Sequence, residues 1–190
     1  MAAVDKGFAW TVAVDGTACV GKSTLLSRMK EEGFAVVVGD YAEDCGRYPL
    51  FRGKAQDKFL ELAYFSYQWG KLQPNHVHDR GPLSALAYAL IVDVMAGERT
   101  LEEARRVIRE TPAGVWAPLS GIRTIILLED DAEEAVARMR RRANGIDTMS
   151  TRYVMVQNEV FATLAERVGA CVLHHRKGQD MGAETPGNGS

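Results

Sequence analysis

A glycine-rich segment near the N-terminus constrains the fold of this chain more than any other feature. Residues 16–23 (GTACVGKS) fit the pattern G-x-x-x-x-G-K-S/T without a mismatch. An apolar run over residues 9–15 precedes the segment, and a helical pattern over 22–32 follows it. In that context the glycines let backbone amides surround a phosphate, and the helix N-terminus adds positive partial charge. The sequence therefore predicts a strand, a phosphate-binding loop and a helix.

The residue types within this loop indicate a nucleoside triphosphate with Mg²⁺. Lys22 would place an ammonium group beside the outer phosphates, and the hydroxyl of Ser23 can bind Mg²⁺. A glycine turn that happens to precede a helix is the alternative, and the agreement of strand, spacing and helix weighs against it. We expect ATP to contact the whole loop: Gly16, Thr17, Ala18, Cys19, Val20, Gly21, Lys22, Ser23 and Thr24.

The rest of the chain alternates between apolar strands and helical segments. This alternation is typical of an α/β fold, here a five-stranded parallel sheet with helices on both faces. Residues 40–54 are expected to be irregular. The further strands are predicted at 34–38, 75–78, 123–128 and 170–173, and the further helices at 56–70, 83–95, 101–111, 131–142 and 153–168.

Length and composition indicate one globular domain. The chain has 190 residues, of which 46% are hydrophobic, and a net charge of −2. We expect a single domain over 1–177 and a disordered tail over 178–190. The near-neutral charge argues against a nucleic acid or membrane partner. Three cysteines without a C-x-x-C pair indicate reduced thiols, so we expect a soluble cytoplasmic protein.

Other motifs separate the functions that a phosphate loop can serve. A switch GTPase needs an Asn-Lys-x-Asp motif, but Lys177 is the only lysine after Lys71. A motor ATPase is usually larger and has a strand that ends in an acidic pair, whereas Asp79 and Arg80 follow the third strand here. An aromatic helix and a basic segment in a chain of this size favour a kinase of small molecules.

Three segments, in this order, resemble the deoxyribonucleoside kinase and thymidine kinase family, including its viral members. They are Val14-Asp15-Gly16 leading into the loop, residues 79–86 (DRGPLSAL) and residues 138–147 (RMRRRANGID). The resemblance spans roughly residues 9–175. It implies a P-loop kinase fold with an arginine-rich lid at about 138–149. It also implies ATP-dependent phosphorylation of the 5′-hydroxyl of a deoxyribonucleoside, with thymidine the leading substrate, and a homodimer through helix 83–95.

The resemblance assigns catalytic and metal-binding roles at the ends of the second and third strands. Asp40 would accept the proton of the 5′-hydroxyl, with Glu43 and Asp44 as alternatives, because the family more often has Glu-Pro at this point. Arg80 would orient the hydroxyl and, with the loop lysine, offset developing charge. Asp79 would hold a Mg²⁺-bound water. A surface aspartate and an ordinary strand-end ion pair are the structural alternatives.

The basic segment that begins at Arg138 is expected to contact ATP, and the residues that follow it are expected to contact the sugar. Arg138 and Arg142 lie four residues apart on one helix face, and their planar guanidinium groups suit phosphate oxygens. Asn144 stands where the family commonly has a further lid arginine. Asp147 matches the position that binds the sugar 3′-hydroxyl in the family. A solvated helix end and a helix N-cap are the alternatives.

The aromatic helix at 56–70 is a candidate for binding the base. Tyr64 could stack on a nucleobase, and Gln56 or Gln68 could read its edge. The sequence distance to Asp79 favours Gln56 as the amide that reads the base, whereas the distance from Asp40 favours Gln68. Both therefore stay candidates. Core packing of the rings is the alternative.

A thymidylate-type monophosphate kinase is the second hypothesis, and a bifunctional enzyme or a nucleotide-binding module without catalysis are others. A monophosphate acceptor needs an arginine on the aromatic helix, and none lies between Lys54 and Lys71. The pattern of Ser84, Ala87 and Tyr88 favours the monophosphate kinase instead. The absence of the arginine places the nucleoside kinase first.

Overall fold

A five-stranded parallel sheet forms the centre of the computed structural model, which describes residues 10–39, 41–142 and 148–175, with the backbone alone for 53–56. The strand order is β2–β3–β1–β4–β5, and every pairing is parallel. This confirms the predicted sheet. The strands are β1 (Thr11–Gly16), β2 (Val36–Val37), β3 (His76–Asp79), β4 (Arg123–Glu129) and β5 (Cys171–His175).

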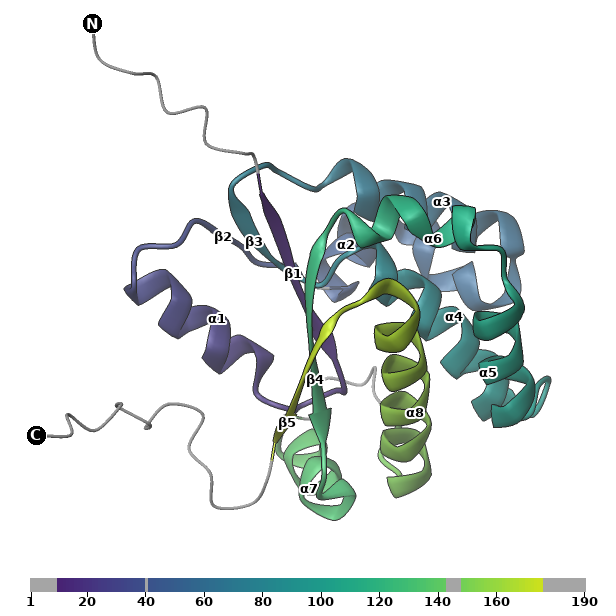
Figure 1. The fold of residues 1–190 in the computed structure, drawn as a ribbon. Helices are drawn as coiled ribbons and strands as arrows, with labels where there is room; N and C mark the ends of the chain where they lie inside the picture. The colour runs from purple at the N-terminus through teal and green to yellow at the C-terminus, as the bar shows by residue number, and fades with distance from the viewer. Residues whose placement is uncertain (1–9, 40, 143–147, 176–190) are drawn as a thin grey trace, which may run out of the picture.

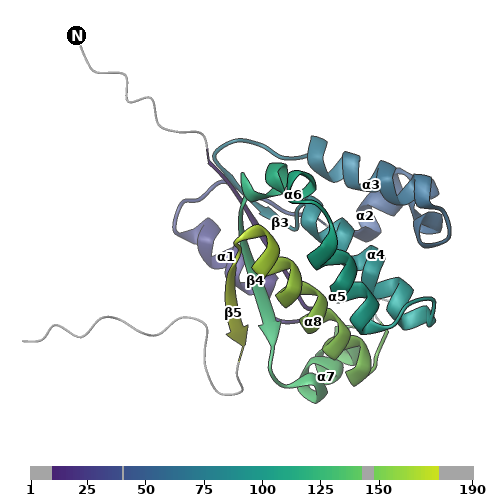
Figure 2. The ribbon, with the colours of Figure 1, turned by 45° about the vertical axis from the view of Figure 1, so that its right-hand side comes forward.

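Helices cover both faces of this sheet (Figure 1). Helix α1 lies on one face, and α4, α5 and α8 lie on the other, as the rotated view also shows (Figure 2). The helices are α1 (Lys22–Glu31), α2 (Tyr41–Arg47), the 3₁₀ helix η1 (Pro49–Gln56), α3 (Lys58–Gly70), α4 (Pro82–Ala96), α5 (Leu101–Glu110), α6 (Ala113–Ser120), α7 (Ala132–Arg142) and α8 (Thr151–Val168).

Strand β4 shows how the two layers are buried. Ile126 and Leu128 pack into the large core formed with α4, α5 and α8, whereas Leu127 packs with Leu26 of α1 on the opposite face. Successive side chains of a strand point to opposite faces, so a strand covered on both sides is apolar along its length. This explains why β4 is the clearest strand in the sequence.

The prediction that residues 40–54 are irregular was wrong. Residues 41–47 form α2, and residues 49–54 form most of η1. Cys45 and Phe51 from this segment are buried against Tyr64 of α3. These tertiary contacts outweigh the low helix propensity of Gly46 and the proline at the start of η1. Helix α6 was not predicted either, and it forms because Trp116 is buried in the main core.

Helix starts follow their capping residues. The predicted capping box of α5 is present, because the Glu103 amide donates to Thr100 Oγ1 at 3.2 Å and the Thr100 amide donates to Glu103 Oε2 at 2.7 Å. Asp57 caps α3 and Ser150 caps α8 through their side chains. These caps place the starts of both helices within two residues of the predicted ones.

The structure does not test several other predictions. The tail at 178–190 and residues 143–147 of the predicted lid lie outside the described residues. Helix α4, expected to form a homodimer, buries Leu83, Ala87 and Ile91 inside the chain, and the dimer stays a prediction. Among the described helices, none is long and apolar enough to cross a membrane.

Gly16 is the residue at which β1 turns into the phosphate loop. Its φ is +122°, and a Cβ there would lie 2.0 Å from the carbonyl oxygen of Leu127. We expect Gly16→Ala to lower the free energy of unfolding by about 2 kcal/mol or more, because the backbone would be strained and β4 would have to move. Urea titration measures the loss. Gly46→Ala, in a helix with nothing within 4 Å of the added Cβ, is the control and should not destabilise. Equal losses in both variants would contradict this explanation.

Candidate active site

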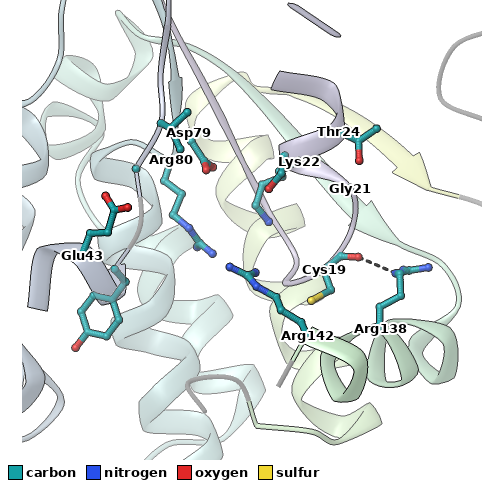
Figure 3. Close-up of a pocket in the computed structure, with 13 residues that line it drawn as sticks. Cys19, Gly21, Lys22, Thr24, Glu43, Asp79, Arg80, Arg138 and Arg142 are labelled. Carbon is teal, nitrogen blue, oxygen red and sulfur yellow. Dashed lines mark hydrogen bonds between the residues drawn. The ribbon is translucent and has the colours of Figure 1, made fainter. Parts of the chain in front are cut away.

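The carboxyl ends of β1 and β3 open into a pocket of about 480 Å³ (Figure 3). Ligands of open parallel α/β sheets bind at this edge. The pocket brings the phosphate loop together with residues from three other segments. Its lining includes Cys19, Gly21, Lys22, Ser23 and Thr24 from the loop and α1, Val38, Gly39, Tyr41 and Glu43 after β2, Asp79 and Arg80 after β3, and Arg138 and Arg142 from α7.

Lys22 is the buried cation of the phosphate loop. Its Nζ donates to the carbonyl oxygens of Gly16 at 2.9 Å and Thr17 at 2.5 Å. Burial, and then the charge of the nearby Arg80, lower the pKa of Lys22 to about 7 against the opposing effects of Asp79 and Asp15. The loop therefore holds a lysine whose charge a bound anion would stabilise.

Asp15 lies beneath the loop and is completely buried. Burial raises the pKa of this carboxyl to about 6, although the charges of Arg80 and Lys22 and the hydroxyl of Ser84 oppose the rise. The β-carbon position of Gly81 is 3.8 Å from Asp15 Oδ2. Asp15 thus supplies compensating charge close to Lys22 and Arg80.

Arg80 has an unusual backbone that aims its side chain into the pocket. Its φ is +70°, a left-handed conformation that is uncommon for non-glycine residues and is enriched at functional sites. Its Nη1 donates to Ser84 Oγ at 3.3 Å, and its guanidinium carbon lies 5.0 Å from the ring centre of Tyr88. Figure 3 shows Arg80, Lys22 and Arg142 pointing toward the same space from three elements. Three converging cations suit a polyphosphate.

The two predicted lid arginines have different surroundings. Arg138 donates from Nε to the carbonyl oxygen of Cys19 at 2.8 Å and from Nη2 to Glu129. Its guanidinium is therefore held against the loop backbone (Figure 3). Arg142, one helical turn later, is exposed and reaches toward Arg80. Arg142 is the arginine of α7 that is better placed to meet a ligand.

Glu129 is a residue of the site that the sequence analysis missed. Its side chain is fully buried at the end of β4 and accepts from Arg138, from the Asp131 amide at 3.0 Å and from His175 Nδ1 at 3.1 Å. An acidic residue at the carboxyl end of the clearest strand is a signal that could have found it, since those ends meet at the ligand edge.

Two amides of α8 hold the phosphate loop from behind. Gln157 Oε1 accepts from the Ala18 amide at 2.8 Å, and Asn158 Oδ1 accepts from Thr17 Oγ1 at 2.5 Å. The loop residues Thr17 and Ala18 are thus anchored to the protein on the side away from the pocket. Gln157 lies three residues after Val154 on the buried face of α8, and a polar residue in an apolar stripe could have indicated this role.

The predicted acceptor residues are only partly within the structure. Asp40, Asp147 and the side chain of Gln56 lie outside the described residues. Tyr64 and Gln68 are buried and bonded to Asp44, and neither lines the pocket. Base binding by these two residues stays a prediction.

The donor set of the pocket suits a magnesium ion that is bound together with phosphates. Ser23 and Asp79, the predicted metal residues, both line it. In the described parts of the chain, no group of three or more His, Cys, Asp or Glu side chains could hold a metal ion alone. Mg²⁺ commonly takes one or two protein oxygens and completes its shell with water and phosphate oxygens.

Sheet order, phosphate loop and pocket define the P-loop kinase fold. Deoxyadenosine kinase from M. mycoides has the same fold. Its structure with bound dCTP aligns with a TM-score of 0.57 and 15% identity over 87% of this chain and 90% of that chain. Its structure with bound dATP aligns with a TM-score of 0.57 and 17% identity over 90% of this chain and 93% of that chain.

One curated relative is similar in sequence. It is an uncharacterised 33.9 kDa protein of Lymantria dispar multicapsid nuclear polyhedrosis virus, 27% identical over 182 residues. The alignment takes in 92% of this chain, which spans 60% of the length of the viral protein. No protein-family model matches the chain.

Proposed function

We propose that the protein transfers the γ-phosphate of ATP to the 5′-hydroxyl of a deoxyribonucleoside. The observation that carries this proposal is one pocket that holds the phosphate loop, Arg80 and Arg142 at its donor side and Glu43 across Arg80 from Lys22 (Figure 3). The fold shared with a deoxyadenosine kinase supports the same reaction class. Cytoplasmic nucleoside salvage is the setting we propose for it.

Phosphoryl transfer depends mainly on alignment and on stabilising charge at the transferred group. Lys22, Arg80 and Arg142 supply the positive charge. Ser23 and Asp79 would hold Mg²⁺, which neutralises charge on the β- and γ-phosphates when bound. The loop anchors at Thr17 and Ala18 keep the backbone amides in place, so little reorganisation is needed when the donor binds.

The acceptor side favours a neutral nucleoside over a monophosphate. Of the described lining residues that follow β2, Val38, Gly39, Tyr41 and Glu43, none is positive and one is acidic. Lys71, the cation at the end of α3, is paired with Asp44. Among the described residues after β2, a phosphate at this side would meet the charge of Glu43, and the nearest cation of the pocket lining, Arg80, already faces the donor side. Thymidine is the substrate we propose first and deoxyadenosine the second.

A coupled ADP-release assay tests this function on a panel of deoxynucleosides and their 5′-monophosphates. Turnover with one or more nucleosides is the expected result. Turnover confined to monophosphates would establish the thymidylate-type reaction instead. ATP binding without turnover on any acceptor would indicate a nucleotide-binding module.

We propose Glu43 as the general base, because it lines the pocket. Asp40, which the sequence favours, lies outside the described residues. We expect Glu43→Gln to lower kcat by about 10²-fold or more, since a base that takes the hydroxyl proton contributes on that scale. Asp40→Asn is the matched variant and should lower kcat much less. The reverse order of the two effects would return the role to Asp40.

The lowered pKa of Lys22 makes ATP binding proton-linked. With a pKa of about 7 in the free protein, Lys22 is mostly neutral at pH 8, whereas a bound phosphate favours its ammonium form. We expect proton uptake when Mg²⁺–ATP binds at pH 8, and weaker binding as the pH rises from 7 to 9. Calorimetry in buffers of different ionisation enthalpy measures the uptake. Lys22→Arg stays charged and should show less uptake, and equal uptake would assign the proton to another group.

A further inference from the structure

Asp44 is a buried carboxylate on which four side chains of one neighbouring segment converge. It is 6% exposed. It accepts from Tyr64 Oη at 3.1 Å, Tyr67 Oη at 3.0 Å and Gln68 Nε2 at 3.0 Å, all from α3. Lys71, which follows α3, donates from Nζ at 3.0 Å. Asp44 is therefore the point at which α2 is fastened to α3.

This arrangement gives the buried carboxylate hydrogen-bond donors and an opposite charge. Lys71 supplies the opposite charge, and the other three donors supply neutral hydrogen bonds. Burial, and then the charge of Asp44, raise the pKa of Tyr64, so that its hydroxyl remains a donor. Each donor reaches Asp44 from a different residue of α3 or its C-terminus, and together they fix the position and rotation of the short helix α2.

The rotation of α2 decides where Glu43 points. Adjacent residues of a helix differ in direction by about 100°. With Asp44 directed into the α2–α3 contact, Glu43 is exposed and lines the pocket. Lys71 Nζ also lies 4.0 Å from the β-carbon position of Gly39, at the end of β2. The same ion pair therefore lies beside the chain segment that leads into α2.

We propose that Asp44 is a positioning residue that holds α2 so that the Glu43 carboxylate meets the acceptor hydroxyl. This inference rests on the proposed function. Asp44 does not line the pocket, so any effect of the residue on turnover must pass through a residue that does.

A double-mutant cycle of Asp44→Asn and Glu43→Gln tests the proposal with the full chain. The asparagine keeps the size of the side chain but removes the charge and one acceptor. We expect Asp44→Asn to lower kcat by roughly tenfold to a hundredfold, the scale of a misplaced catalytic group, with KM for ATP within about twofold. In the Glu43→Gln background the same substitution should lower kcat no further.

Asp93→Asn is the matched control. Asp93 is also a buried carboxylate, 7% exposed, and it pairs with Lys58 and Arg99 at the far end of α4. The Asp93→Asn substitution should lower the melting temperature without changing kcat by more than about twofold. Tyr67→Phe removes one donor and retains the ring, so it tests the proposal even where Asp44→Asn fails to fold. It should lower kcat in the native background and not in the Glu43→Gln background.

The outcomes separate this proposal from the proposed function. Equal losses of kcat from Asp44→Asn or Tyr67→Phe in both backgrounds would overturn the positioning role and leave the kinase activity standing. A change in melting temperature alone, with native kcat, would also overturn it. A native protein that turns over no nucleoside would instead overturn the proposed function.

Discussion

Lys22→Ala is expected to lower kcat/KM for nucleoside phosphorylation at least about a hundredfold. Removing one preorganised group that stabilises transition-state charge costs on that scale. Lys22 is buried in the phosphate loop. In the alanine variant, water that entered the space of the lost side chain would supply no positive charge. The steady-state ADP-release assay with Mg²⁺–ATP measures the effect.

Two further variants make this result specific. Lys22→Met keeps most of the volume and loses the charge, so it should lose as much activity as the alanine variant. Lys30→Ala, at an exposed position of the same helix, should retain native kcat/KM. Full activity in Lys22→Met would mean that the ammonium group is not used, and it would remove the basis of the proposed reaction.

The loop could be predicted because its determinants are local. The two glycines with positive φ, Gly16 and Gly21, and the buried Lys22 all belong to one short segment, so the sequence pattern of that segment identifies them. Strand β4 was predictable for a related reason, since a strand buried on both faces of a parallel sheet has a nearly continuous apolar sequence.

The acceptor side could not be predicted in the same way, because it is built by contacts between distant segments. Asp44 receives its partners from residues 20 to 27 positions later in the chain. Those contacts turn a segment with a central glycine into helix α2 and expose Glu43 to the pocket. The sequence favoured Asp40 and left Glu43 and Asp44 as alternatives, and the rotation of α2 distinguishes these last two.

The role of Gln68, which contacts Asp44 from α3, could not be predicted from the sequence for the same reason. The sequence indicates an amide on an aromatic helix, which suits reading a base. In the structure its Nε2 donates to Asp44 and to the hydroxyl of Tyr64, at 2.7 Å. Whether an amide faces a ligand or a buried carboxylate depends on what the opposite helix presents, and no pattern within α3 contains that information.

Glu129→Ala is expected to produce the largest loss of stability, about 3 kcal/mol or more. The substitution removes the fully buried carboxylate that accepts from the Arg138 guanidinium and from the Asp131 amide, and removing one partner of a buried ion pair costs on that scale. For a chain of this length such a loss lowers the melting temperature by roughly 6 °C or more. Thermal and urea unfolding measure it.

Glu134→Ala is the matched control, because Glu134 also lies near Arg138, at 3.7 Å, but is partly exposed. A solvated ion pair of this kind contributes at most about 1 kcal/mol, so this variant should unfold close to the native protein. The double variant Glu129→Met with Arg138→Met removes both partners of the buried pair and should recover much of the stability, since two apolar side chains leave no charge unpaired. It should not recover activity to the same extent, because the bond from Arg138 to the Cys19 carbonyl oxygen is lost with the pair. Full recovery of both properties would mean that Glu129 and Arg138 stabilise the fold without shaping the phosphate loop.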